Sequence, residues 1–287
     1  MFNADKNKHT LFLERNGVKA ELDFHPVSGM MTWRQLPEYM QFLTVKGTNI
    51  WREIDRKLLL IGGANSEIRK WLHEIDINAE ITNIDFYSEP NPSVSEHHIK
   101  EDFYDWKIHL NYYDQAWALW SLPAYSFSKT ELEIFFIKAA ISLAPGGILR
   151  VFPVNRGPGD MGSYNKKYTN EKRRLDSINV FNFLAKLGYS IETIFPKDMD
   201  NIVELLKNSR KQFHILIHKF LNEISNRQDV HKPNRIEEEL LNYQNKEPDK
   251  APFAVNVTAP SNVAIKHAAN MTLIEYLNSI NLSASNI

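Results

Sequence analysis

The chain has 287 residues, 43% of them hydrophobic and 24% charged, which is typical of a globular protein that can bury a sizeable core. Its 34 basic and 35 acidic residues give a net charge of −1, so overall charge favours neither nucleic acid nor a membrane surface as partner. The chain has no cysteine, which excludes disulfides, thiolate zinc sites and cysteine nucleophiles. We expect a cytoplasmic protein, because residues 1–10 lack a signal-peptide core and no stretch approaches the about 20 apolar residues of a membrane span. Secretion without a cleavable signal would leave the same pattern.

Residues 1–54 are predicted to form an N-terminal extension. Within it, residues 10–25 predict a hairpin, because two strand-like segments flank the turn dipeptide Asn16-Gly17. Residues 32–43 predict a helix, since apolar side chains recur there at helical spacing. The extension either caps a pocket or serves as a packing or dimer element, and a homodimer is one interpretation.

Residues 55–220 alternate between strand and helix patterns. The predicted strands are residues 57–61, 80–85, 97–100, 115–120, 148–153, 189–195 and 212–219. The predicted helices are residues 65–74, 129–143, 176–187 and 200–208. This alternation predicts a parallel sheet covered by helices, hence an α/β core.

Residues 221–287 differ in pattern from the core. They predict a short helix over 237–244, an extended segment over 248–260 and a capped amphipathic helix over 272–280. We therefore expect a partly helical C-terminal appendage.

The most informative segment is the strand pattern ending at Ile61, followed by Gly62, Gly63, Ala64, Asn65 and Ser66. A buried strand that feeds a glycine turn and then a helix is a common ligand-binding arrangement. Glycine allows both a sharp turn and the close approach of a ligand. Glycine at this place also serves packing alone in many α/β folds.

An ordered set of motifs resembles the class I S-adenosylmethionine-dependent methyltransferases over residues 55–220. The set consists of the Gly62-Gly63 turn, Asp85 at the end of a strand, Glu101-Asp102-Phe103, Asp114 followed by Trp120-Ser121-Leu122-Pro123, and Leu143-Ala144-Pro145-Gly146-Gly147-Ile148-Leu149. The resemblance implies a Rossmann-like sheet of seven strands, the last of them antiparallel. Residues 189–195 and 212–219 would supply the final pair.

The resemblance implies S-adenosylmethionine as cofactor and assigns residues to it. Residues Gly62, Gly63, Ala64, Asn65 and Ser66 would pack against its methionine part. Asp85 would accept both ribose hydroxyls, Asp102 would bind the adenine amino group, and Phe103 would stack on the ring. Leu119, Trp120 and Ser121 would line the crevice that presents the methyl group. Asp85 and Asp102 also suit capping of a turn or helix, and Trp120 also suits a core.

The chain departs from the family pattern in the turn. Ala64 and Ser66 stand where the family has glycine, and Leu60 stands where an acidic residue is common. This favours a second hypothesis, a catalytically inactive protein of the same fold that acts as a protein-binding or regulatory module. A nicotinamide-dependent enzyme is a third hypothesis, although a dinucleotide turn requires more glycine.

Methyl transfer depends chiefly on proximity, so no strong catalytic motif is expected. The candidates for a general base or substrate contact are Asp114, His109, Tyr125 and Tyr164. A small-molecule acceptor is favoured over a protein, and nucleic acid is not expected. Residues 155–164 suit a lid or substrate loop because they are rich in glycine. The basic run 166–174 favours a solvated helix face over a phosphate-binding site.

No metal site is predicted. His97 and His98 are adjacent, and neighbouring residues of a strand point to opposite faces, so the two rings cannot easily share one ion.

Overall fold

The computed structural model describes residues 9–15, 18–24, 57–63, 68, 72, 78–86, 97–119, 121–155, 168–195 and 253–284. The described strands are β1 (His9–Arg15), β2 (Val18–Phe24), β3 (Lys57–Ile61), β4 (Glu80–Ile84), β5 (His97–Ile99), β6 (Tyr113–Leu119), β7 (Leu143–Phe152), β8 (Ser190–Ile194) and β9 (Ala254–Thr258). The described helices are α3 (Lys129–Ser142), α4 (Asn170–Lys186) and α8 (Val263–Ala284).

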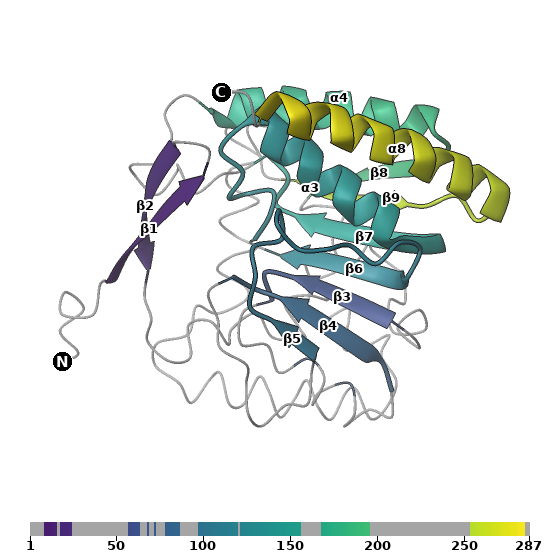
Figure 1. Ribbon diagram of the computed structural model, residues 1–287, viewed down its shortest axis with the longest axis horizontal. Coiled ribbons are helices and arrows are strands. Elements are labelled where there is room, and N and C mark those ends of the chain that lie inside the picture. Colours follow the sequence, from purple (N-terminus) through teal and green to yellow (C-terminus); the bar gives the residue numbers. More distant parts are fainter. Residues whose placement is uncertain are drawn as a thin grey trace.

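Seven strands form one sheet in the order β5-β4-β3-β6-β7-β9-β8 (Figure 1). The pairs β3–β4, β4–β5, β3–β6 and β6–β7 are parallel, and β9 is antiparallel to both β7 and β8. Counted along the chain, its first five strands follow the order 3-2-1-4-5 of the doubly wound fold. The predicted Rossmann-like, seven-stranded sheet with an antiparallel last strand is therefore confirmed.

The last strand of the sheet comes from a different segment than predicted. β9 lies between β7 and β8 and is the antiparallel last strand, which the sequence analysis expected from residues 212–219; these lie outside the described residues. Residues 254–258 thus belong to the sheet, although they were expected in a C-terminal appendage. Their five-residue strand pattern was hidden by the prolines that flank it, at positions 252 and 260.

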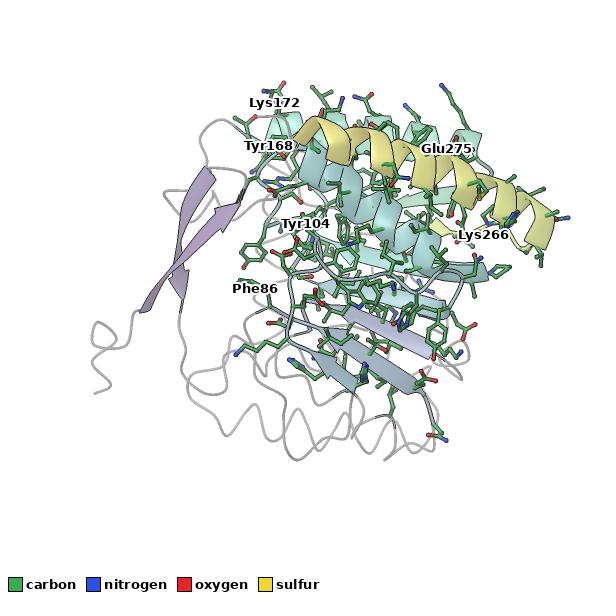
Figure 2. The ribbon with its side chains drawn as sticks, viewed as in Figure 1. Phe86, Tyr104, Tyr168, Lys172, Lys266 and Glu275 are labelled. Carbon is green, nitrogen blue, oxygen red and sulfur yellow. The ribbon has the colours of Figure 1, made fainter. Side chains whose placement is uncertain are left out.

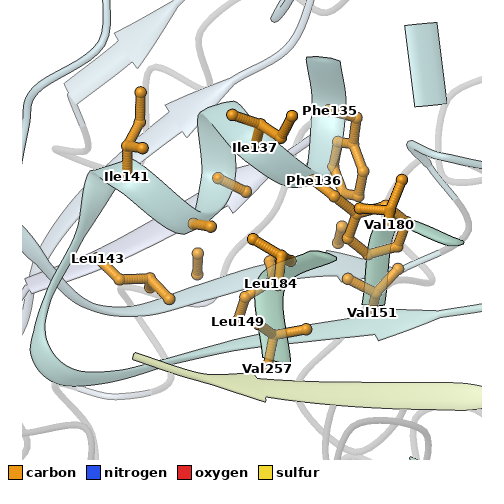
Figure 3. Packing of buried hydrophobic residues seen from close by; sticks show 14 of the residues in the cluster. Phe135, Phe136, Ile137, Ile141, Leu143, Leu149, Val151, Val180, Leu184 and Val257 are labelled. Carbon is orange, nitrogen blue, oxygen red and sulfur yellow. The ribbon is translucent and has the colours of Figure 1, made fainter. Parts of the chain in front are cut away.

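The three described helices lie together on one side of the sheet (Figure 1). Alternate residues of β7 and β9 face them, so that Leu149, Val151 and Val257 pack under Phe135 and Phe136 of α3 (Figure 3). Both rings are fully buried. Burial of a side chain of this size stabilises a fold by roughly 2–3 kcal/mol, so this cluster anchors the sheet behind the site.

Two helices begin earlier than the sequence analysis predicted. α4 starts at Asn170 instead of residue 176, because the Thr169 hydroxyl accepts the Lys172 N–H at 3.2 Å. α8 starts at Val263 instead of residue 272, because Asn262 Oδ1 accepts backbone N–H groups of the first turn at 3.0 and 3.2 Å. Both helices begin at a capping residue that precedes the apolar residues used for the prediction, so the predicted helices were too short.

Several smaller predictions are also settled. The N-terminal hairpin is confirmed, with β1 and β2 antiparallel and Arg15 opposite Val18. α4 ends at Lys186, close to the predicted end at residue 187, and Gly188 follows with a φ of 91°. Of the helix predicted over 65–74, the structure describes Ile68 and Leu72, both helical and buried. The predicted helices over 32–43, 200–208 and 237–244 lie outside the described residues.

Candidate functional site

The order of strands fixes where a ligand crevice can form. The chain leaves β3 toward β4 on one side, whereas β6 occupies the other side, so strand order reverses between β3 and β6. Open α/β sheets bind ligands outside the carboxyl ends of the strands at such a reversal. We call the two ends of the parallel strands the carboxyl end and the amino end of the sheet. In Figure 2 the labelled residues Phe86, Tyr104 and Tyr168 lie toward the carboxyl end, and Lys266 lies toward the amino end.

The glycine turn lies at the carboxyl end of β3. Gly62 has a φ of 65°, and its N–H donates to the Ile84 carbonyl at 2.7 Å. A Cβ at Gly62 would lie 2.5 Å from the Ser121 Cβ, and a Cβ at Gly63 would lie 2.5 Å from Asn83 Oδ1. Packing against Ser121 and the Asn83 side chain therefore already accounts for both glycines. Ala64, Asn65 and Ser66 lie outside the described residues.

The segment after β6 braces this turn. The buried Ser121 hydroxyl donates to the Ile61 carbonyl at 2.6 Å, which links the end of β6 to the end of β3. Leu119 is buried and pairs with Phe152. Trp120 lies outside the described residues. Ser121 thus holds the glycine turn in place through its hydrogen bond to Ile61. Its contact with a cofactor stays a prediction.

Asp85 follows β4 directly, at the same end of the sheet. Its N–H donates to the Ile99 carbonyl at 3.1 Å, and its side chain is buried. The next residue, Phe86, is 39% exposed. This places a carboxylate at the carboxyl end of β4, the position that the resemblance assigned to the ribose.

Asp102 closes a turn that follows β5. Its Oδ1 accepts the Tyr104 N–H at 3.1 Å, and its carbonyl accepts the N–H groups of Asp105 and Trp106 at 3.0 and 2.9 Å. The Phe103 ring is 3% exposed and packs on the rings of Trp106 and Phe135, with centroids 5.8 and 5.7 Å away. Phe103 is therefore a core residue in this structure, and its stacking on an adenine stays a prediction.

The three described candidates for a base or substrate contact, Asp114, His109 and Tyr125, do not come together. The Asp114 carboxylate accepts the Lys57 N–H at 3.1 Å, and His109 is exposed and stacked on Tyr113, so both lie at the amino end. Tyr125, half-buried in the segment after β6, lies at the carboxyl end. Tyr164 lies outside the described residues. The sequence placed these residues near strands without showing which strand end each would occupy.

Sequence reasoning missed a buried cation at the carboxyl end. Arg173, expected on a solvated basic face, is 3% exposed and donates from Nη1 to the Pro123 carbonyl at 2.7 Å. Its guanidinium lies 4.7 Å from the centroid of the Tyr168 ring, and burial lowers its pKa. Helical spacing could have revealed it, because it shares one face of α4 with Ser177, Val180, Phe181 and Leu184.

Lys138 of α3 is a second missed cation. Its ammonium donates to three backbone carbonyls of the turn that Asp102 closes, those of Phe103, Tyr104 and Trp106. Burial lowers its pKa to about 8, while the carboxylates of Asp105, Asp102 and Glu101 oppose that shift. No sequence signal marked this residue, because a lysine on a helix is usually solvated.

The described residues contain no group of three or more metal-ligating side chains close enough to hold an ion. His97 is exposed, and His98 Nδ1 lies 3.3 Å from the amide nitrogen of Asn83. In the described part of the chain, no helix combines the length and apolar character needed to cross a membrane.

No protein-family model matches the chain, and no curated protein matches it. Solved structures similar to it include the plantazolicin methyltransferase BpumL with a triazolic desmethylPZN analog and SAH (11% identity, 71% of this chain and 76% of that one, TM-score 0.43). Others are the [4+2]-cyclase SpnF (17%, 83% and 86%, 0.39) and phosphoethanolamine N-methyltransferase 2 of Haemonchus contortus with S-adenosyl-L-methionine (14%, 79% and 56%, 0.39). The order and directions of the seven strands define the chain as a Rossmann-like α/β protein.

Proposed function

We propose that the chain is an S-adenosylmethionine-dependent methyltransferase that binds its cofactor at the carboxyl end of the sheet. One observation carries this proposal. The glycine turn, Asp85 and Asp102 follow β3, β4 and β5, three neighbouring parallel strands, beside the reversal of strand order. Three separate strands thus bring two carboxylates and a glycine turn, whose backbone a ligand can approach closely, to one end of the sheet.

The residues at this end fit a nucleoside in chemical character. The Asp85 carboxylate would accept the two ribose hydroxyls, and charge-assisted hydrogen bonds of this kind are strong. The Asp102 carboxylate would accept the adenine amino group. The bound cofactor would supply a methyl group on a sulfonium for in-line displacement. The protein would contribute orientation of acceptor and donor, with Tyr125 and Tyr164 as candidate acceptor contacts.

We propose a small molecule as acceptor, because the described residues present no aromatic-interleaved basic stripe for nucleic acid. A cytoplasmic location and a homodimer stay predictions.

A second function is favoured by specific observations at the turn. Packing against Ser121 and Asn83 accounts for Gly62 and Gly63 without a ligand, and the buried Leu60 replaces an acidic residue. A catalytically inactive protein of this fold that binds a protein partner is therefore the alternative.

Calorimetric titration with S-adenosylmethionine, S-adenosylhomocysteine and, as control, NAD separates these functions. Micromolar binding of either sulfur compound and none of NAD would support the methyltransferase. Binding of NAD alone would indicate the nicotinamide-dependent alternative. Absence of binding by all three would overturn the proposal and favour the inactive protein.

A further inference from the structure

One buried ammonium, that of Lys138, holds the turn after β5. Lys138 is 7% exposed, and its Nζ donates to the carbonyls of Phe103, Tyr104 and Trp106 at 2.8, 2.7 and 2.8 Å. An ammonium has three N–H donors and no acceptor, so these bonds use all of them. The lysine therefore fixes three points of one short backbone segment.

Hydrogen bonds of Asp102 and Tyr104 also fix this turn. Asp102 accepts three backbone N–H groups through its carboxylate and carbonyl. The Tyr104 hydroxyl hydrogen-bonds the Ser126 hydroxyl at 2.8 Å, which joins the turn to the segment after β6. Because the turn is not a helix or strand, these bonds and Lys138 determine its conformation.

Burial of an ammonium costs free energy, so a buried ammonium indicates that the groups around it require hydrogen-bond donors. Three carbonyls converge on one buried point, and each would otherwise lose a hydrogen bond with water. A neutral side chain such as methionine would fill the space but satisfy none of them. The charge is also favoured by the nearby carboxylates of Glu101, Asp102 and Asp105.

We propose that Lys138 is a positioning residue for recognition of adenine: it holds the turn so that the Asp102 carboxylate meets the adenine amino group. This inference rests on the proposed function, because it takes the adenine of the cofactor as the ligand of Asp102. Lys138 itself would not touch the cofactor, because its three N–H groups are donated to carbonyls of the turn.

The chemistry of the ammonium predicts a pH dependence. Loss of a proton leaves two N–H donors for three carbonyls, so one carbonyl loses its partner and the turn loosens. Burial lowers the pKa of Lys138 to about 8. Discrimination by Asp102 should therefore decline as pH rises from 7 to 9.

The test uses two nucleosides that differ only in the group that Asp102 would bind. These are 5′-methylthioadenosine and its purine analogue without the 6-amino group, and neither titrates between pH 7 and 9. Calorimetry would give the ratio of their affinities for wild type, K138M and K138Q at pH 7. The matched control is K266M, since Lys266 is also a buried lysine with a pKa lowered to about 8 but lies at the amino end.

We expect the wild type to prefer the 6-amino compound and K138M to lose about tenfold of this preference, since hydrogen bonds to a charged group are lost. K138Q should fall between the two because its amide retains two donors. K266M should keep the wild-type ratio. An unchanged ratio in K138M or K138Q would overturn the inference while leaving the proposed function intact.

Wild-type protein provides a measurement that does not depend on a folded variant. Its affinity ratio should fall between pH 7 and pH 9, and a constant ratio would overturn the role of Lys138. If the wild type binds neither nucleoside nor S-adenosylhomocysteine, the proposed function fails and the inference falls with it.

Discussion

The two ends of the sheet place the same residue types in different settings. At the amino end, Asp114 accepts the Lys57 N–H, and Lys266 and Asn270 connect α8 to α3 and to Asn111. These polar groups hold elements together. At the carboxyl end, Asp85 and Asp102 follow parallel strands beside the reversal of strand order. The strand end at which a carboxylate lies therefore determines which groups it can contact.

The largest expected contrast lies between two glycines with positive φ, one at each end. Gly62→Ala should lower the free energy of unfolding by about 3 kcal/mol, because the left-handed backbone is strained and its Cβ would overlap Ser121. At the amino end, Gly146 has a φ of 76°, but its Cβ would meet only Ser261, at 3.8 Å. Gly146→Ala should therefore cost about 1 kcal/mol. Urea denaturation measures both, and equal losses would contradict the packing role of Gly62.

Two carboxylates give the next contrast. Asp85→Ala should weaken binding of S-adenosylhomocysteine by about a hundredfold, since two charge-assisted hydrogen bonds to the ribose are lost. Asp114→Ala should leave this affinity unchanged, because Asp114 bonds the Lys57 backbone at the amino end. Calorimetric titration measures both variants. If Asp85→Ala binds as tightly as the wild type, Asp85 is not the ribose ligand.

The amino end should show the reverse pattern, a loss of stability without a loss of binding. Asn270 Oδ1 accepts from Lys266 Nζ at 2.6 Å, and its amide donates to Asn111 Oδ1 at 2.8 Å. Asn270→Ala should lower the free energy of unfolding by about 2 kcal/mol, because a buried ammonium loses one of its two acceptors. Thermal unfolding checks the loss, and an accompanying drop in S-adenosylhomocysteine affinity would show that the two ends are coupled.

Much of the core could be predicted because its signals are local. Apolar strands, a glycine turn and amphipathic helices identified β3, β4, β6, β7 and α3 from short windows of sequence. β9 could not be found this way, because its place between β7 and β8 is determined by long-range pairing. The same limit applied to the site. The position of Asp85 at a strand end was readable, whereas the inward turn of Lys138 and Arg173 depends on carbonyls far away in sequence.

The smallest expected effect concerns the two buried lysines, Lys138 against the turn after β5 and Lys266 at the amino end (Figure 2). Burial lowers the pKa of Lys138 and of Lys266 to about 8, whereas an unfolded lysine keeps its proton to about 10.5. Between these values the unfolded chain binds more protons, so stability rises with pH. Each lysine should add about 1 kcal/mol between pH 8 and 9. Above pH 10 the gain should reverse, because burial raises the pKa of Tyr113 to about 12 and an unfolded tyrosine ionises first.

Urea denaturation from pH 7 to 9.5 would measure this gain, and K266M should retain only the part due to Lys138. The lysines then separate by function. Titration of Lys266 should change stability alone, while titration of Lys138 should also change the preference for a 6-aminopurine. If stability is flat between pH 8 and 9 in the wild type, both ammonium groups keep their protons there. In that case the carbonyls around Lys138 and the acceptors around Lys266 outweigh the cost of burial.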